Sequence, residues 1–291
     1  MSNFKINLLL IGAALTLALT GCGSLALDTS DSDTGSTGSA AQLQLAGSTT
    51  VQPLAEELAE AYMAKNADVT IEVQGGGSSV GVTSAGEDTV DIGMASREVK
   101  SSEMDEFPEL QVFTIAYDGI AIVTNPEVEL ATLSEAQIQG IFAGEITNFN
   151  QVGGPDADII VVSREEGSGT RAAFEELVME YKDDAGEKQM KPITEKALLQ
   201  QSNGQVRTTV STTPNTIGYL SFGFLDDSTL AVPVDNVMPT AENVSNSSYP
   251  IFRPLNMLTS GAPDDAAQAF LDFILGDEGQ AIVTQEYISV E

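Results

Sequence analysis

Short apolar runs and longer amphipathic stretches alternate along the chain from residue 43 onward. Short continuous or alternating apolar runs predict strands, whereas apolar residues spaced about three or four positions apart predict helices. The expected strands cover residues 43–46, 69–73, 90–94, 120–123 and 159–162, and the expected helices cover residues 53–65, 134–141, 170–181 and 264–283. This alternation is typical of an α/β fold with largely parallel sheets.

Two of these segments carry more specific expectations. The run 120–123 has no polar position, so we expect a strand that is buried on both faces. In the expected helix 170–181, the apolar stripe includes Leu177, Val178 and Tyr181. We therefore expect these three side chains to face the core.

Residues 1–22 predict a secretion signal that is not part of the fold. Lys5 precedes an apolar run of roughly fifteen residues, which is shorter than the about twenty that a membrane-spanning helix needs. The run ends in Leu-Thr-Gly followed by Cys22, which resembles a bacterial lipobox and implies cleavage before Cys22 and a lipid on its sulfur. An uncleaved signal anchor is the alternative. Residues 23–42 are rich in Ser, Thr, Gly and Asp, which predicts a flexible tether.

The composition narrows the possible functions. The chain has 43 acidic residues against 12 Lys and Arg, a formal charge of −31, which opposes binding to nucleic acid and to anionic lipid. It contains no His, the commonest general base near neutral pH. Its single Cys excludes an internal disulfide and a Cys cluster for zinc. The acidity is spread along the chain, which indicates a solvated surface for a salty environment, with recruitment of cations as the alternative.

Glycines and small hydroxyl residues gather in three turns, each of which follows a predicted strand and opens a predicted helix. They are AGSTTVQP at 46–53, QGGGSSVG at 74–81 and SREEGSGTR at 163–171. A helix N-terminus presents free backbone N–H groups and about half a positive charge, so it attracts anions. Glycine permits close approach of the ligand, and Ser or Thr adds a hydroxyl donor. A single turn of this kind is typical of ordinary helix capping, but three together predict an anion site.

A fourth element lies at the end of the third predicted strand, where Ser96 and Arg97 follow each other. An arginine presents a planar fork of donors that matches phosphate oxygens, and the third turn contains a second one, Arg164. The alternative for Arg97 is a surface ion pair with Glu98 or Glu103. With only 12 basic residues in the chain, two arginines beside hydroxyl turns favour a binding site.

These segments together resemble the phosphate-binding proteins of Pst-type ABC importers. The resemblance follows, in order, GSTTVQPLAEELAEAY, GGGSSVG, VDIGMASRE, FAGEITNF, SREEGSGTR and IGYLSFG. It implies an α/β two-lobe clamp of the periplasmic-binding-protein type, in which each lobe is a mixed, mainly parallel sheet flanked by helices. The chain would cross between the lobes near Asn125 and Tyr249, which gives residues 43–124 and 250–291 to lobe one and 125–249 to lobe two.

The turns and the resemblance together give the candidate ligands of the anion. They are Ser48, Thr49 and Thr50 in the first turn, Ser78 in the second, Ser96 and Arg97 in the fourth element, and Arg164, Ser168, Gly169 and Thr170 in the third turn. Glu166 matches the family's acidic residue that holds the arginine of the third turn in place.

One position departs from the family pattern. Better-known members have an acidic residue at the end of the VD-x-G strand, which accepts a hydrogen bond from protonated phosphate and so excludes sulfate. Ser96 and Arg97 stand there in this chain. Asp118 is a candidate substitute acceptor, and its alternative role is that of a turn residue before Gly119. Selectivity for phosphate over sulfate is therefore open.

The resemblance implies an extracytoplasmic protein that captures phosphate by closing its lobes and hands it to the permease subunits of an ABC importer. It would act without a cofactor or metal, contact the membrane only through the lipid on Cys22, and work as a monomer. A binder of sulfate, molybdate or tungstate and an anion sensor are the alternatives. A phosphohydrolase would need an activating base or metals that the sequence does not offer. Nucleotide binding is not expected, because neither common phosphate-loop motif occurs at a suitable position.

Overall fold

The computed structural model describes residues 41–183 and 185–290. The predicted lipobox at Cys22 and nearly all of the predicted tether lie outside the described residues. The first strand begins at Ala41, slightly earlier than the predicted residue 43, because its first residues already pair with the second strand.

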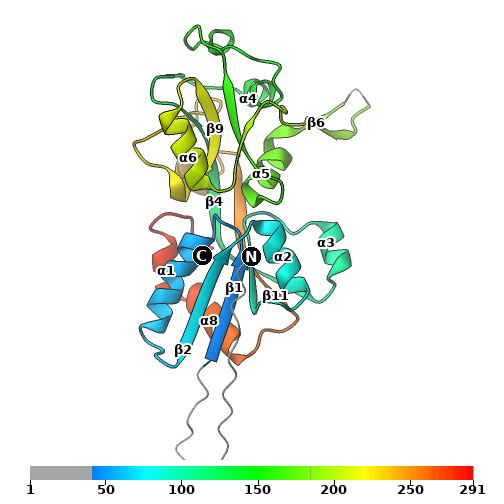
Figure 1. Cartoon of the computed structure of the whole chain (residues 1–291), viewed down its shortest axis with the longest axis vertical. Coiled ribbons are helices and arrows are strands. Elements are labelled where there is room, and N and C mark those ends of the chain that lie inside the picture. The colour runs from blue at the N-terminus through cyan, green and yellow to red at the C-terminus, as the bar shows by residue number, and fades with distance from the viewer. Residues whose placement is uncertain (1–40, 184, 291) are drawn as a thin grey trace, which may run out of the picture. The chain divides into compact units, whose positions relative to one another are not determined.

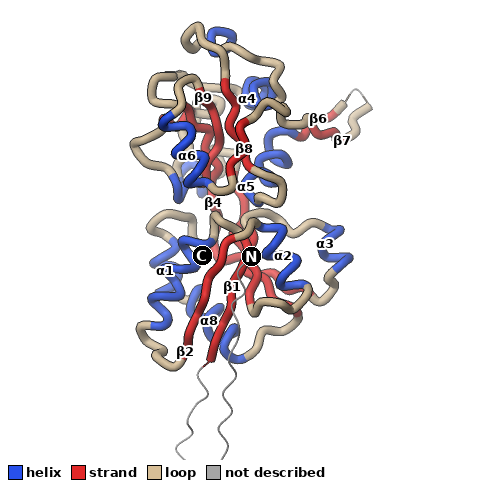
Figure 2. Tube along the Cα trace, viewed as in Figure 1, coloured by secondary structure: helices blue, strands red, loops and turns tan. Residues whose placement is uncertain are grey.

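Strands and helices alternate through the described residues (Figure 1, Figure 2). The strands are β1 (Ala41–Gly47), β2 (Val69–Gly75), β3 (Ile92–Ala95), β4 (Leu110–Thr124), β5 (Ile160–Arg164), β6 (Glu180–Lys182), β7 (Lys188–Met190), β8 (Leu198–Gln200), β9 (Thr216–Ser221), β10 (Leu230–Val232) and β11 (Phe252–Ser260). The α-helices are α1 (Gln52–Met63), α2 (Ser78–Gly86), α3 (Ser101–Glu106), α4 (Glu135–Phe142), α5 (Gly169–Phe174), α6 (Asn203–Thr212), α7 (Ala241–Ser245), α8 (Asp265–Leu275) and α9 (Asp277–Val283). Short 3₁₀ turns η1 (Phe149–Val152) and η3 (Phe222–Phe224) and a π-helical turn η2 (Glu175–Met179) connect them.

The strands form one mixed sheet, and a small hairpin of β6 and β7 stands apart from it. The strand order is β2-β1-β3-β11-β4-β9-β5-β8, with β10 paired to β4. Strand β1 runs parallel to β2 and β3, and β5 runs parallel to β8 and β9. Strands β4 and β11 in the middle are antiparallel to their neighbours. The predicted α/β architecture is confirmed, with parallel pairing on both sides of an antiparallel centre.

Strands β4 and β11 each contribute to two separate hydrophobic cores. The part of β4 before Gly119 pairs with β11, and the part after it pairs with β9. Ile115 packs in the first core and Ile120 packs in the second. The returning chain does the same in reverse, because Ile251 belongs to the second core and Leu255 to the first. These two strands therefore connect two packed bodies, which lie above and below the label of β4 in Figure 1.

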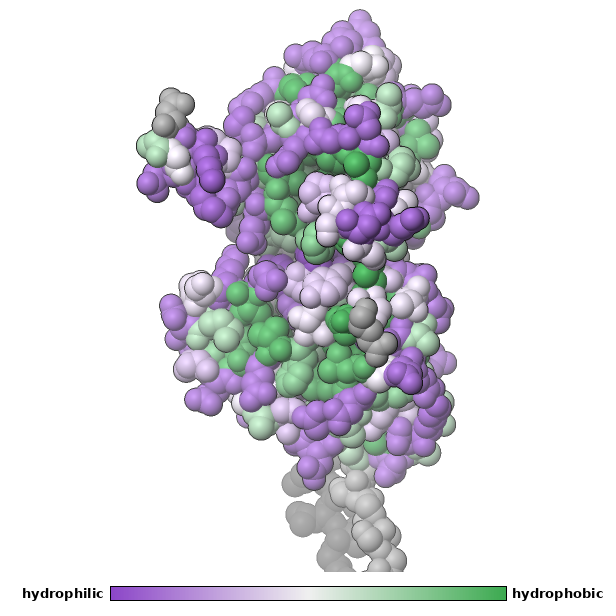
Figure 3. Space-filling view, turned by 180° about the vertical axis from the view of Figure 1, so that it is seen from behind, coloured by the Kyte–Doolittle hydropathy of each residue, from purple (hydrophilic) through white to green (hydrophobic). Residues whose placement is uncertain are grey.

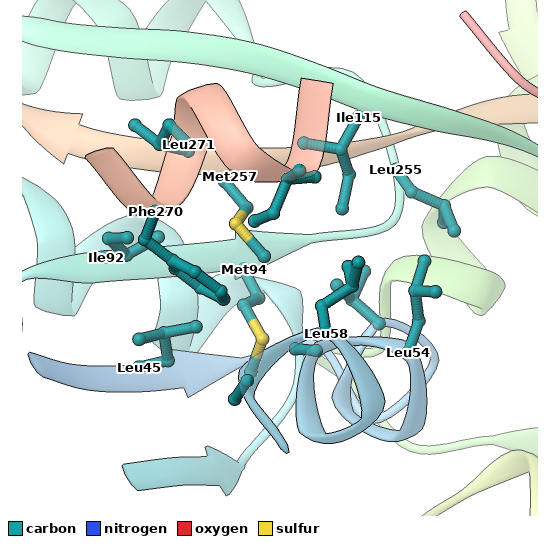
Figure 4. Packing of buried hydrophobic residues seen from close by; sticks show 14 of the residues in the cluster. Leu45, Leu54, Leu58, Ile92, Met94, Ile115, Leu255, Met257, Phe270 and Leu271 are labelled. Atoms are coloured by element: carbon teal, nitrogen blue, oxygen red, sulfur yellow. The ribbon is translucent and has the colours of Figure 1, made fainter. Parts of the chain in front are cut away.

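The first core packs helices α1 and α8 against the sheet (Figure 4). Leucines of α1 and Phe270 of α8 point at two methionines in the sheet, Met94 of β3 and Met257 of β11. The second core packs α4 and α5 against β9, where the ring of Phe174 stacks on that of Tyr219 with centroids 4.2 Å apart. Apolar burial of this kind is the main favourable contribution to folding.

Two predicted helices are wrong in their extent. The expected helix 170–181 ends as α5 at Phe174 and continues as the π-helical turn, after which Tyr181 belongs to strand β6. The wider π turn changes the helical phase, so Val178 is buried while Leu177 and Tyr181 are exposed. The expected helix 264–283 is broken into α8 and α9 at Gly276, whose extended backbone caps both helices.

Acidic and other polar side chains cover much of the face opposite to that of Figure 1 (Figure 3). Between these polar areas, hydrophobic residues also reach the surface (Figure 3). Tyr117 and Phe252, in the two connecting strands, are among the exposed large side chains. Within the described residues, no helix has both the length and the apolar character needed to cross a membrane.

Candidate functional site

The first turn folds so that its hydroxyls lie at the beginning of α1. The Oγ atom of Ser48 accepts hydrogen bonds from the backbone N–H groups of Thr50 and Val51, at 3.2 and 3.3 Å. Gly47 is required here, because its φ is +137° and a Cβ atom would lie 2.3 Å from the carbonyl oxygen of Met94. The turn is thereby held against the end of β3, and Ser48 and Thr50 are both buried.

The second turn is held against the first by a backbone hydrogen bond from Gly77 N to Gly47 O of 2.9 Å. Ser78 follows as the first residue of α2 and is fully buried. Its Oγ atom accepts a hydrogen bond of 3.0 Å from the backbone N–H of Ser96, at the end of β3. Three segments of the first body, the ends of β1, β2 and β3, therefore place small hydroxyl side chains at one edge of the sheet.

The third turn brings the second body to the same edge. Gly169 begins α5 and approaches so closely that a Cβ atom on it would lie 2.1 Å from Ser78 Oγ and 2.5 Å from Ser96 Oγ. The backbone N–H of Ser79 donates a 3.2 Å hydrogen bond to the carbonyl oxygen of Gly167. Ser168 acts as the N-cap of α5 and accepts from the N–H of Arg171. The two bodies thus meet through their Ser/Thr/Gly turns.

Five buried hydroxyl groups lie where the turns meet, and we call them the hydroxyl cluster: Ser48, Thr50, Ser78, Ser96 and Thr170. The Oγ atoms of Ser48 and Ser96 are 2.9 Å apart, and those of Ser78 and Ser96 are 3.4 Å apart. Between the two bodies, the Oγ1 atoms of Thr50 and Thr170 are 3.1 Å apart. The sequence analysis named all five as candidate ligands, four in the turns and Ser96 in the fourth element, and the structure brings them together.

Arg164 reaches the hydroxyl cluster from the end of β5 and is almost completely buried. Its Nη2 atom donates to Thr49 Oγ1 at 3.2 Å, and its Nη1 atom lies 3.5 Å from Thr170 Oγ1. Its carboxylate partner is Glu165, at 3.0 Å from Nη2 and 3.1 Å from Nε. The prediction that Glu166 holds this arginine is wrong, because Glu166 is exposed and makes no such contact.

The two candidate residues of the fourth element, Ser96 and Arg97, have different partners in the structure. Ser96 belongs to the hydroxyl cluster, whereas Arg97 forms an ion pair with Glu103, at 2.6 Å between Nη2 and Oε1. This is one of the two ion pairs that the sequence offered as the alternative for Arg97, although the arginine is buried and not at the surface. Ser96 and Arg97 directly follow β3, and only Ser96 contacts the cluster.

Asp118 is fully buried in β4, and its partner is Arg253 of β11. The Oδ2 atom accepts from Nη2 of Arg253 at 2.8 Å and from Nε at 3.1 Å, and the Oδ1 atom accepts from the backbone N–H of Phe222 at 3.0 Å. Burial raises the pKa of the Asp118 carboxyl, and the positive charge of Arg253 offsets only part of that rise. Asp118 therefore has a structural partner in each body.

Sequence reasoning missed two residues of this region. Arg253 donates to Thr50 Oγ1 at 3.3 Å, and Asn203 donates to the same atom at 2.8 Å through Nδ2. Both side chains are buried. The signals were an arginine within the apolar strand that follows Ile251 and a further Ser-Asn-Gly turn at the start of α6. Neither has the repeated glycines and hydroxyls that drew attention to the other turns.

The hydroxyl of Tyr219 supports the third turn from within the second core. It lies 2.8 Å from Ser163 Oγ and accepts from the N–H of Arg164 at 3.2 Å. Burial raises the pKa of Tyr219 to about 12, so the phenol is neutral at physiological pH. This neutral group fixes the end of β5, from which Arg164 extends.

The arrangement presents donors, since hydroxyl, amide and guanidinium groups converge on one buried place. Such groups suit an anion with several acceptor oxygens, because each oxygen can receive more than one hydrogen bond. Among the described residues, no group of three or more His, Cys, Asp or Glu side chains is placed to hold a metal ion. The geometry is therefore that of a binding site for a small oxyanion.

Comparison with known proteins gives a consistent result. A family model described as "PBP superfamily domain" matches residues 32–278. The chain is 33% identical to the phosphate-binding protein PstS of Bacillus subtilis (strain 168), over 100% of this chain and 95% of the relative. It is 30% identical to PstS of Borreliella burgdorferi, over 84% of this chain and 88% of the relative.

Solved structures with the same fold include phosphate receptors. A phosphate ABC transporter substrate-binding protein from Clostridium perfringens, described with bound phosphate, is 40% identical and superposes with a TM-score of 0.79, over 86% of this chain and 100% of that one. An ABC-type phosphate transport receptor from Vibrio cholerae is 32% identical with a TM-score of 0.70, over 84% and 99%. Each of these two structures therefore superposes on most of this chain.

Proposed function

Because the chain belongs to the family of PstS phosphate-binding proteins, within the PBP superfamily, we propose that it captures inorganic phosphate between two lobes and delivers it to an ABC importer. The observation that carries this proposal is the hydroxyl cluster, where five buried hydroxyls from both bodies converge beside Arg164. An oxyanion bound there would replace contacts between neutral hydroxyls with hydrogen bonds to a charged acceptor, which are shorter and stronger. No bond of the ligand is made or broken, so the protein acts as a carrier.

The lobes of this clamp correspond to the two bodies. Along the outward strand, Ala116 packs in the first core and Ile120 in the second. Along the returning chain, Ile251 packs in the second core and Leu255 in the first. We therefore assign the crossings to Asp118–Gly119 and to Phe252–Arg253, earlier on the outward strand than the Asn125 that the resemblance suggests. Rotation about these two strands would open the hydroxyl cluster, and a ligand that bridges both lobes would favour the closed form.

The proposed ligands are the members of the hydroxyl cluster together with Thr49, Arg164, Ser168 and Gly169. Glu165 is assigned the role of holding Arg164, in place of Glu166. Arg97 is left outside the site, because its guanidinium is committed to Glu103. Asp118 is retained as the acceptor of a hydrogen bond from the protonated ligand, since its Oδ1 atom receives one backbone N–H and a carboxylate oxygen has capacity for a second donor.

Titration calorimetry tests the proposal directly, using the full chain in mild detergent with phosphate and then sulfate as ligands. We expect heat of binding with phosphate and none with sulfate, because a fully deprotonated anion cannot donate to Asp118. An Asp118→Asn variant should lose this discrimination, because the amide Nδ2 can donate to sulfate. A folded wild-type chain that binds neither anion would refute the proposed function, and equal binding of both would limit it to a general oxyanion clamp.

We place the protein on the outer side of the cell membrane, held there by a lipid on Cys22. Two acyl chains on one residue give stable anchoring, whereas a single chain is marginal. A Cys22→Ser variant should move from the membrane fraction to the soluble fraction while it keeps its phosphate affinity. Retention of this variant in the membrane would contradict the lipid anchor and favour an uncleaved signal segment.

A further inference from the structure

Three arginines are almost completely buried in this acidic protein, and they differ in how their nitrogens are used. Both terminal nitrogens of Arg97 bond to Glu103, and both of those of Arg164 have oxygen partners. The Nη1 atom of Arg253 is buried and has no hydrogen-bond partner among the described residues. The Nε atom of Arg97 also lacks a partner, but only Arg253 of these two arginines contacts the hydroxyl cluster, through Thr50. A buried donor without a partner is costly, so a site that keeps one indicates a ligand.

We propose that Arg253 is a second guanidinium ligand of the oxyanion, and that Asp118 is the positioning residue that aims it. The inference rests on the proposed function and adds a residue to that site. The Nη2 atom of Arg253 already donates to Thr50 Oγ1, a member of the hydroxyl cluster, at 3.3 Å. Its neighbour Nη1 is bonded to the same planar guanidinium carbon, so it lies close to the nitrogen that contacts Thr50.

The orientation of Arg253 is fixed by its strand partner. Residues Arg253 and Asp118 are directly opposite each other in the antiparallel pairing of β11 with β4. Nε and Nη2 both donate to Asp118 Oδ2, which leaves Nη1 as the nitrogen that points away from the carboxylate. One flat group thus has one edge bound to Asp118 and the other edge free for an acceptor oxygen.

The charge balance of the site supports the same role. Arg164 is paired with Glu165, and Arg253 is paired with Asp118, so each cation has its charge compensated before a ligand arrives. Burial lowers the pKa of Arg253, and the negative charge of Asp118 offsets only part of that fall. A compensated pair can stay charged in a buried place, and each guanidinium can still give a charge-assisted hydrogen bond to an anion.

The position of Arg253 also connects ligand binding to the crossing between the lobes. Arg253 is at the start of β11 in the connecting segment, and Asp118 accepts the N–H of Phe222 from the second body. Thr50, the other contact of Arg253, belongs to the first body. An anion on Nη1 would therefore bind to a group that contacts the first body directly and the second body through Asp118.

Phosphate titration of the full chain and of an Arg253→Lys variant tests the inference. Lysine keeps the positive charge beside Asp118 but lacks the second edge of the guanidinium. We expect its dissociation constant for phosphate to rise about tenfold to a hundredfold, since a hydrogen bond to a charged group is lost. The matched control is Arg207→Lys, because Arg207 pairs with Asp226 and lies outside the hydroxyl cluster. Its affinity should remain within about twofold of the wild type.

A second variant separates the effect on phosphate binding from the effect on folding. Asp118→Asn with Arg253→Met removes both charges together, so that no carboxylate is left buried without a partner. Thermal unfolding without phosphate reports the structural role of the pair, and calorimetry on the folded variants reports the ligand role. We expect the double variant to bind phosphate at least as weakly as Arg253→Lys. Either folded variant with wild-type affinity overturns the inference, whereas a wild-type chain that binds no phosphate overturns the proposed function itself.

Discussion

Gly169 offers a sharp test of how the two lobes close, through the substitution Gly169→Ala. A Cβ atom at this position would lie 2.1 Å from Ser78 Oγ and 2.5 Å from Ser96 Oγ, where real Cβ atoms do not approach within 3.0 Å. Gly169 does not have a positive φ, so the added methyl group acts only through this contact. The third turn would have to withdraw from the other two by about 1 Å.

The energetic cost should fall on the closed form alone. Ser78 and Ser96 belong to one lobe and Gly169 to the other, so rotation about the connecting strands relieves the clash. Overpacking of this kind costs about 1–3 kcal/mol, which corresponds to an affinity for phosphate that is about 5-fold to 150-fold weaker. The thermal stability of the unliganded protein should change little, because the open form accommodates the methyl group.

Calorimetry with phosphate and thermal unfolding without it would measure the two effects separately. Gly204→Ala is the matched control, because this glycine of α6 has its nearest neighbour, Ser202 Oγ, at 3.8 Å and room for a methyl group. The control should keep its affinity and gain slightly in stability, by about 0.5–1 kcal/mol. A folded Gly169→Ala variant that binds phosphate within twofold of the wild type would show that the closed contact is not needed for capture.

Three further predictions concern residues around the site. Glu165→Gln should weaken phosphate binding by about tenfold in calorimetry, because the buried Arg164 loses its charged partner. The matched Glu166→Gln variant should bind like the wild type, and equal effects of the two substitutions would refute the assignment of Glu165 as the residue that holds Arg164. Burial raises the pKa of Glu103, but its hydrogen bond to Arg97 and other favourable contacts outweigh this and lower it below 4.5. Glu103→Gln should therefore cost about 2 kcal/mol in denaturant unfolding at neutral pH, and the difference should vanish as the pH falls through the lowered pKa; a pH-independent difference would contradict the ion pair. Tyr219→Phe removes the hydroxyl contacts to the end of β5 and should lower the free energy of unfolding by about 1 kcal/mol in the same assay. An unchanged stability would show that the hydroxyl does not support the end of β5.

Local signals in the sequence were enough to find most of the hydroxyl cluster. Glycines and small hydroxyl residues at a helix start depend on local backbone geometry, so the turns at Gly47, Gly77 and Gly169 could be recognised without knowing the fold. The alternation of strands and helices likewise predicted the α/β architecture. What the pattern could not give was which of these turns meet, because that depends on the pairing of distant strands.

The residues that the sequence analysis missed or assigned to the wrong role also depend on contacts that the sequence pattern does not show. Arg253 faces Asp118 only because β11 pairs antiparallel with β4, and the two residues are far apart in the sequence. Arg97 follows Ser96 directly, yet its guanidinium pairs with Glu103 and does not join the cluster. The pairing of Arg164 with Glu165 and not with Glu166 depends on the local path of the chain after β5. A shift of one position in sequence changes which side chain is buried.

The shared strand β4 has a consequence for how the protein unfolds. Its first half completes one core and its second half completes the other, so neither body holds all of its own backbone partners without the continuous strand. Excision of either body would expose an unpaired strand edge, which favours aggregation. Denaturant should therefore melt both bodies in a single cooperative transition, and new chain termini would be tolerated at exposed loops such as Gly186 and not within the two connecting strands.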